Sequence, residues 1–452
     1  MITNKRKSSL ILLSLMLVLS ACGGSDTATE EVAEVVVEEE SLDSPATTAA
    51  PAAEPEGLKV GIVLGALGDL SFMDSAKRGY DKAVAELGIQ GDYVETEPSE
   101  RAAAIQNFLA DGKEMIITIG FSEAEITKEA AIANPDVQFA IVDMVVTADN
   151  GDLLPNVQNL IFKEHEGSFE VGYIAGKLSK TGHVAFMGGM DVPIIRKFQT
   201  GWEEGARYAN PDIKVCDGYA GSWGDPAKGK EIALACFEQG ADIIFAAGGS
   251  TGNGAYEAAE ETGNFAIGVD SNQDFMHPGT MITSMMKNVD YSVYAAISDR
   301  VDAGMVMSSI NSYGSAENGV GPTWLVDGSS LFADEGPADM AAQVAALTAE
   351  VAEVRAKIIS GEIVVTDVTI PCALTDTTGK TVVLPYLLEV TPEFIRLPSI
   401  LISCVPSKST PAPFTLPGLF PAAATLMPIS LSFSNFVARS ASPTKLPKND
   451  VA

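Results

Sequence analysis

Two patterns of apolar and polar residues alternate along the chain from residue 58 to about residue 368. Short apolar runs, rich in β-branched residues, lead into a glycine-rich or polar loop and then into a stretch with helical spacing. The pattern repeats at intervals of about 25 to 30 residues, which predicts β-α-β units and an α/β fold with parallel sheets. The predicted strands are 58–64, 92–95, 115–120, 138–143, 157–162, 183–187, 214–219, 242–247, 265–269 and 281–285. The predicted helices are 75–87, 101–111, 123–134, 168–178, 196–209, 227–239 and 253–261.

Two parts of this pattern resemble each other. The strand, loop and helix at 59–83, ending in RGYDKA, are echoed at 183–206, which ends in TGWEEGA. Two similar α/β lobes would produce such a repeat, with Tyr80 and Trp202 in the cores rather than at a ligand. Open parallel sheets bind ligands beyond the carboxyl ends of their strands, so residues that follow strands are the candidates for function.

The first 57 residues predict export and anchoring in a bacterial envelope, facing the extracytoplasmic side. Residues 1–21 have a basic start, a short apolar run and small residues at the end, as in a signal peptide. The segment Leu-Ser-Ala-Cys that ends at Cys22 resembles a bacterial lipobox, whose cysteine is lipidated. The alternative is an ordinary secretory signal with a chance cysteine. Residues 22–57 are acidic and poor in apolar residues, so we expect a disordered tether.

The last segment, 398–452, differs from the rest of the chain. It is rich in proline, serine and threonine, and its basic residues outnumber its acidic ones. Its apolar pieces lack helical spacing and are interrupted by proline, so we predict no packed domain there. Either it is a flexible tail or it reflects a frame error in the coding sequence.

Charge and cysteine content limit the classes of partner. With 29 basic and 60 acidic residues, the formal net charge is −31, so the phosphate backbone of a nucleic acid would be repelled. The cysteine spacing does not suggest zinc, and we expect neither a metal nor a cofactor. Cys216 and Cys236 lie on a predicted strand and on the helix after it, where they either form a disulfide or stay reduced.

The loop after the first predicted strand is the first candidate for ligand contact. Its glycine spacing is not G-x-G-x-x-G, so a dinucleotide fingerprint is absent from residues 65–74. The loop offers an acceptor, Asp69, a hydroxyl, Ser71, and an aromatic ring, Phe72, at the start of a helix. Asp74 can equally be read as the N-cap of that helix.

Carboxylates and glycines follow the later strands. Asp143 and Asp270 each end a strand, where they either meet a ligand or serve as ordinary loop residues. The loop at 248–254 is glycine-rich, and Gly248 would let the backbone approach a polar ligand closely. The same loop matches the G-x-S-x-G motif of hydrolases around Ser250, but His277 lies too near Asp270 in the chain for us to expect catalysis.

Lys287 follows the strand predicted at 281–285. Beside a carboxylate such as Asp270, a lysine makes a donor and acceptor pair that suits a vicinal diol such as ribose. A surface salt bridge is the competing interpretation.

Taken together, these segments resemble the basic membrane protein family, also called the purine nucleoside receptor type, of substrate-binding lipoproteins of ABC transporters. The resemblance runs in order from Lys59 to about Val364. It is carried by GDLSF (68–72), NPDVQFAIVD (134–143), EGSFEVGYIAGKLSKTGHVAFMGG (166–189), GSWGDPAKGK (221–230), AAGGSTGNGA (246–255), IGVDSNQ (267–273), TSMMKNVD (283–290) and KIISGEIVV (357–365).

The resemblance implies a type I periplasmic-binding-protein fold, in which two Rossmann-like lobes joined by three crossovers close on a nucleoside. It places the substrate-binding domain at 58–397. Lobe 1 would be about 58–162 plus 285–325, and lobe 2 about 163–284 plus 326–390.

The resemblance also implies ligand contacts. Phe72 from one lobe and Trp223 from the other would sandwich the base. Asp270 and Lys287 would hold the ribose hydroxyls, and Gly248, which has no side chain, would let the ligand come close to the backbone.

The polar edges of the base would be read by Asp69 and Asp143. Met73 stands where the family usually has a polar residue, and this leaves the base preference open. The Phe-to-Trp exchange at Trp223 keeps a stacking face.

The function implied is therefore capture of a purine nucleoside by a monomeric, non-enzymatic receptor, with permease and ATPase on separate chains. A receptor for a sugar or another small polar ligand on the same fold, and an envelope sensor, are the alternatives.

Overall fold

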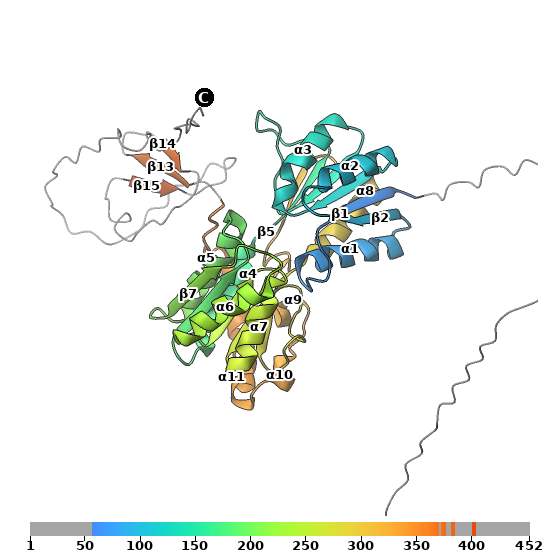
Figure 1. Ribbon diagram of the computed structural model, residues 1–452. Helices are drawn as coiled ribbons and strands as arrows, with labels where there is room; N and C mark the ends of the chain where they lie inside the picture. The colour runs from blue at the N-terminus through green and yellow to red at the C-terminus, as the bar shows by residue number, and fades with distance from the viewer. Residues whose placement is uncertain (1–56, 370–371, 377–380, 385–399, 404–452) are drawn as a thin grey trace, which may run out of the picture. The chain divides into compact units, whose positions relative to one another are not determined.

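Two six-stranded sheets organise the protein, seen in a computed structural model that describes residues 57–369, 372–376, 381–384 and 400–403 (Figure 1). The strand order is β11-β5-β4-β3-β1-β2 in the first sheet and β12-β10-β9-β8-β6-β7 in the second. Each sheet belongs to one lobe.

The first sheet is parallel throughout. Its strands are β1 (Lys59–Leu64), β2 (Gln90–Glu95), β3 (Met115–Ile119), β4 (Gln138–Val142), β5 (Val157–Phe162) and β11 (Ser309–Tyr313). Its helices are α1 (Phe72–Glu86), α2 (Arg101–Ala110), the 3-10 helix η1 (Phe121–Glu123), α3 (Ala124–Ala133) and α8 (Val289–Ala303). Side chains of β1 alternate between two cores, with Ile62 facing α1 and α8 and Val63 facing α2 and α3.

The second sheet is parallel except at one edge, where β12 runs antiparallel to β10. Its strands are β6 (His183–Gly188), β7 (Lys214–Tyr219), β8 (Ile243–Ala247), β9 (Phe265–Asp270), β10 (Met281–Lys287) and β12 (Val320–Pro322). Its helices are α4 (Glu164–Leu178), α5 (Pro193–Ala209), α6 (Pro226–Glu238), α7 (Thr251–Thr262), α9 (Thr323–Val326), α10 (Phe332–Glu335) and α11 (Ala338–Ser360). Phe186 of β6 packs toward α4 and α5, and the next residue, Met187, packs toward α6 and α7.

Three chain segments connect the lobes, as the resemblance implied. They lie between β5 and α4, between β10 and α8, and between β11 and β12. The second and third crossovers lie at other positions in the chain than the lobe boundaries that we predicted. Residues 285–287 and 320–325 belong to the second lobe, because β10 continues to Lys287 and β12 pairs with it, so the return into lobe 1 covers about 288–319.

Helices α4 and α5 pack unusually closely in lobe 2. A Cβ atom at Gly205 of α5 would clash with the carbonyl oxygen of Phe169 in α4, so only glycine fits this contact. Trp202 of α5 is fully buried and Tyr80 of α1 is 1% exposed, which confirms the prediction that both aromatic residues belong to the cores.

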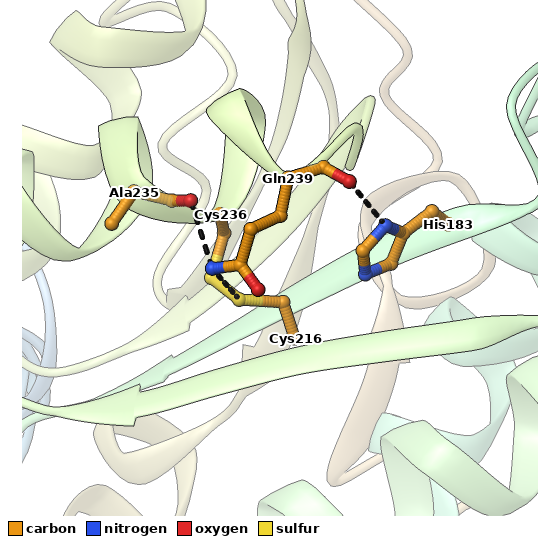
Figure 2. Close-up of a disulfide and its surroundings, with 5 residues drawn as sticks. All are labelled: His183, Cys216, Ala235, Cys236 and Gln239. Carbon is orange, nitrogen blue, oxygen red and sulfur yellow. Dashed lines mark hydrogen bonds between the residues drawn. A yellow bond between two sulfur atoms is a disulfide. The ribbon is translucent and has the colours of Figure 1, made fainter.

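A disulfide joins the edge strand β7 to helix α6. The Sγ atoms of Cys216 and Cys236 lie 2.06 Å apart (Figure 2). The side-chain amide of Gln239 donates to the sulfur of Cys216 at 3.5 Å and to the carbonyl oxygen of Ala235 at 2.9 Å. The backbone oxygen of Gln239 lies 3.2 Å from Nδ1 of His183, so the bridge sits in a small polar cluster.

Beyond α11, a three-stranded antiparallel sheet has the order β14-β13-β15. Its strands are β13 (Cys372–Asp376), β14 (Thr381–Leu384) and β15 (Ile400–Ser403). Four residues of the segment predicted to contain no packed domain therefore form a strand. The rest of that segment, the signal peptide, Cys22 and the acidic tether up to residue 56 lie outside the described residues.

Candidate functional site

Three charged residues meet where strands β4, β9 and β10 end. Asp143 follows β4, Asp270 is the last residue of β9, and Lys287 is the last residue of β10. Both aspartates have positive φ angles, 69° for Asp143 and 64° for Asp270, a backbone conformation that non-glycine residues seldom adopt. Such strained backbone is found preferentially at functional sites, where surrounding contacts hold it in place.

Lys287 is the centre of this group. Its Nζ lies 2.7 Å from Oδ2 of Asp143 and 3.1 Å from Oε1 of Glu164, and its side chain is 2% exposed. Burial by itself would lower the pKa of Lys287, but the attraction of Asp143, Glu164 and Asp270 outweighs it and raises the pKa above 10.5. The ammonium group therefore stays charged across the physiological pH range.

The two aspartates are buried acceptors with raised pKa values. Burial raises the pKa of Asp143 and of Asp270 to about 6 each, although the charge of Lys287 acts in the opposite direction. Asp270 accepts a hydrogen bond of 2.6 Å from Oγ of Ser71, which links the loop before α1 in lobe 1 to lobe 2. Oδ1 of Asp143 is buried without a hydrogen-bond partner among the described residues, so it can accept a hydrogen bond from another molecule.

Aromatic rings surround the lysine. The Nζ of Lys287 lies 4.8 Å from the ring centroid of Phe72, 5.1 Å from that of Phe162 and 5.6 Å from that of Phe198. Phe72 begins α1 and is half-buried. Of the predicted residues, Lys287 contacts Asp143 and Phe72, and Ser71 contacts Asp270, whose charge also acts on Lys287.

Asp69 has a different environment from the one we expected. Its carboxylate accepts hydrogen bonds from the backbone N–H groups of Ser71, Met73 and Asp74, so it caps the start of α1. Asp74, the alternative cap, lies inside the helix and accepts from the loop N–H groups of Gly68 and Leu70. Burial raises the pKa of Asp69, whose charge in turn helps to raise the pKa of Asp270.

Trp223 and Gly248 form a second group, in lobe 2. The Trp223 side chain is 41% exposed, and a Cβ atom at Gly189 would clash with its ring. A Cβ atom at Gly248 would lie 3.3 Å from the backbone nitrogen of Gly189, so the two loops approach each other closely. The backbone oxygen of Trp223 accepts from Oγ of Ser250 at 3.1 Å, which anchors the loop that carries the ring.

The geometry gives the hydrolase interpretation no support. The Ser250 hydroxyl donates to the carbonyl of Trp223, and Nδ1 of His277 faces Oε2 of Glu260 at 2.8 Å. Asp270 instead accepts from Ser71. The three residues of the formal Ser, Asp, His order therefore have separate partners.

Sequence reasoning missed Glu164, which contacts Lys287, and two charged residues beyond it, Lys197 and Asp367. Glu164, the first residue of α4, is 1% exposed and binds Lys287 through one oxygen and Lys197 through the other. Lys197 in turn faces Asp367 at 3.3 Å. Although burial acts against it, the attraction of Lys197 and Lys287 lowers the pKa of Glu164, which stays ionised. The sequence did contain one signal of this buried cluster, because Lys197 stands next to Phe198 on the apolar face of an amphipathic helix.

Within the described residues, no helix is long and apolar enough to cross a membrane, and no group of His, Cys, Asp and Glu side chains could hold a metal ion.

Comparison with known proteins assigns the family. Residues 59–369 match the family described as ABC transporter substrate-binding protein PnrA-like. Basic membrane protein A of Borreliella burgdorferi is 37% identical over 234 residues, covering 51% of this chain and 68% of that protein. Basic membrane protein D of the same species is 34% identical over 263 residues, covering 58% and 76%.

A similar solved structure is that of ABC transporter system solute-binding proteins from Aeropyrum pernix K1, with a TM-score of 0.58 and 27% identity. The alignment covers 68% of this chain and 94% of that one. A solute-binding protein from Conexibacter woesei has a TM-score of 0.53 at 22% identity and supports the fold alone. The chain therefore belongs to the PnrA-like family of ABC transporter substrate-binding proteins and has the two-lobed fold of type I periplasmic binding proteins.

Proposed function

We propose that this protein captures a purine nucleoside between its two lobes and delivers it to an ABC permease for uptake. The observation that carries the proposal is the position of Lys287, which is buried against Asp143 and lies 4.8 Å from the ring of Phe72. A charged donor, buried acceptors and an aromatic face in one place suit a ligand that has both hydroxyl groups and a flat ring.

Each part of a nucleoside has a matching partner. Lys287 donates to ribose oxygens, and Asp270 accepts from the ribose hydroxyls. The free Oδ1 of Asp143 accepts from an N–H group of the base. Phe72 and Trp223 supply stacking faces from the two lobes, and each stacked face contributes about 1 to 3 kcal/mol. Asp69 acts through α1, by capping the turn that presents Phe72.

In this proposal the protein is a receptor, which binds the nucleoside without making or breaking a covalent bond. Lobe closure buries the nucleoside, and the permease and ATPase on separate chains supply the transport step. We further propose that a lipid on Cys22 holds the protein at the bacterial membrane, facing the extracytoplasmic side, with residues 22–57 as the spacer.

The direct test of the ligand is isothermal titration of the protein with adenosine, guanosine, inosine, uridine and free ribose. We expect purine nucleosides to bind and free ribose not to bind, because the base supplies the stacking energy. The variants Trp223→Ala and Asp270→Ala should both lose binding while they remain folded. A folded protein that binds ribose or another sugar, and no nucleoside, would replace the nucleoside receptor by a sugar receptor.

The anchor is tested separately, by expression in a bacterial host fed with labelled palmitate. The wild-type protein should carry the label and sediment with membranes, and Cys22→Ser should carry no label. Equal labelling of the two proteins would remove Cys22 as the lipid site.

A further inference from the structure

We infer that Glu164 is a positioning residue for Lys287, and that its carboxylate, held from behind by Lys197, sets where the ammonium group meets the sugar hydroxyls of the ligand. The inference rests on the proposed function and deepens it. Neither Glu164 nor Lys197 needs to touch the ligand in order to act in this way.

The carrying observation is a buried row of alternating charges. Nζ of Lys287 lies 2.7 Å from Asp143 and 3.1 Å from Oε1 of Glu164, whose Oε2 lies 2.9 Å from Nζ of Lys197. The row ends at Asp367, 3.3 Å from Nζ of Lys197. Every internal charge is thus compensated on both sides.

The row connects parts of the protein that are distant in sequence. Asp143 belongs to lobe 1, and Lys287 directly precedes the crossover from β10 to α8. Glu164 directly follows the crossover from β5 to α4, and Lys197 also donates to the backbone oxygen of Phe162, the last residue of β5, at 2.7 Å. The position of Lys287 is therefore tied to two of the three interlobe crossovers.

Burial makes each charge in the row dependent on its partners, because an uncompensated charge in a protein interior is strongly destabilising. Glu164 is 1% exposed, Lys287 2% and Lys197 7%. A lysine side chain has four flexible carbons, and Asp143 alone would leave its ammonium group free to swing around one partner. A second carboxylate on another element removes that freedom, and the three N–H donors still leave one for a ligand.

The substitution Glu164→Gln tests the inference with little disturbance of packing. It keeps the shape of the side chain and divides the row into two neutral pairs, Asp143 with Lys287 and Lys197 with Asp367. The remaining four charges each retain one partner, so we expect the variant to fold.

The readout is the part of the affinity that depends on the sugar hydroxyls. Wild-type protein and the Glu164→Gln variant are titrated with the purine nucleoside that binds best and with its 2′,3′-dideoxy analogue. The Kd ratio is the Kd of the dideoxy analogue divided by the Kd of the nucleoside. We expect this ratio to fall about tenfold in the variant, because the Kd of the nucleoside rises while that of the dideoxy analogue is unchanged. Equal weakening of both ligands, or no weakening, would overturn the inference, because a structural role alone would not separate them.

Glu170→Gln is the matched control. Glu170 lies on the same helix, is fully buried and faces Arg355 at 3.7 Å, but makes its hydrogen bond with Ser315 instead of serving the ligand site. This variant should keep the wild-type Kd ratio. A fall of the ratio in Glu170→Gln as large as in Glu164→Gln would also overturn the inference.

A second variant covers the case in which Glu164→Gln does not fold. Glu164→Asp keeps the charge but withdraws the carboxylate by one methylene group, and should give a Kd ratio below that of the wild type. A wild-type ratio in this variant would refute the positioning role. Failure of the wild-type protein to bind any nucleoside would instead overturn the proposed function, so the two failures are distinguishable.

Discussion

Replacing Asp270 with asparagine should stabilise the ligand-free protein at neutral pH and, at the same time, abolish nucleoside binding. Burial raises the pKa of Asp270 from 3.8 to about 6, despite the opposing charge of Lys287 and the hydrogen bond from Ser71. The folded state therefore binds a proton more tightly than the unfolded state does. The stability due to this proton is fully present below about pH 4 and is lost as the pH rises through 6.

The size of the effect follows from the two pKa values. A pKa of about 6 in the folded protein, against 3.8 in the unfolded chain, corresponds to about 3 kcal/mol of unfolding free energy at pH 7.5. At pH 4.5 it corresponds to only about 1 kcal/mol, because the folded state is then almost fully protonated and the unfolded state is partly protonated. Asparagine is neutral at every pH, and its side-chain oxygen can still accept from Ser71. Asp270→Asn should therefore gain about 3 kcal/mol at pH 7.5 and about 1 kcal/mol at pH 4.5.

Urea unfolding of the wild-type and variant proteins at the two pH values measures both gains. Asp274→Asn is the control, because burial also raises the pKa of Asp274 to about 6, while its partners are Ser284 and Thr323 within lobe 2. It should show the same pH trend with unchanged nucleoside affinity. An Asp270→Asn protein that is no more stable than the wild type at pH 7.5 would refute the reasoning.

Three further outcomes are expected. Removal of the disulfide by Cys216→Ser with Cys236→Ala should lower the unfolding free energy by about 3 kcal/mol, because the bridge joins residues 20 positions apart. A reducing agent should lower the urea midpoint of the wild type but not that of the variant. Gly205→Ala should cost about 1 to 3 kcal/mol in the same assay, although alanine is the better helix former, because its Cβ would clash with α4. Lys287→Met should abolish nucleoside binding in titration. It should also destabilise the protein more at pH 7.5 than at pH 5, because at the higher pH the Asp143 carboxylate is ionised and buried without its partner, whereas at the lower pH it can take up a proton.

Local pattern was sufficient for ten of the twelve strands in the two large sheets, β1 to β10, and for the helices that connect them. Central strands such as β3 are buried at every position and read as nearly continuous apolar runs, interrupted in β3 only by Thr118. Helices such as α5 bury residues at helical spacing on one face. The prediction missed the short edge strands β11 and β12, which have five and three residues, and the small sheet that includes β15. It also missed helices α8 and α11, which follow the last predicted strand. Pairing of such short strands depends on partners distant in sequence rather than on periodicity.

The candidate site divides in the same way. The sequence already predicted that Asp143, Asp270 and Lys287 follow strands. Parallel topology brings residues in this position to one edge of a sheet. The sequence could not show that Asp69 caps a helix, because a loop carboxylate satisfies backbone N–H groups and ligand groups equally well.

The sequence by itself determined the α/β architecture, the family and most residues that meet at the site, because periodicity and local motifs are properties of neighbouring residues. Only the tertiary structure decided that Lys287 is enclosed by Glu164, and Glu164 by Lys197. These contacts join residues more than 30 positions apart, and burial decides whether a charge is a solvated surface group or part of a compensated row.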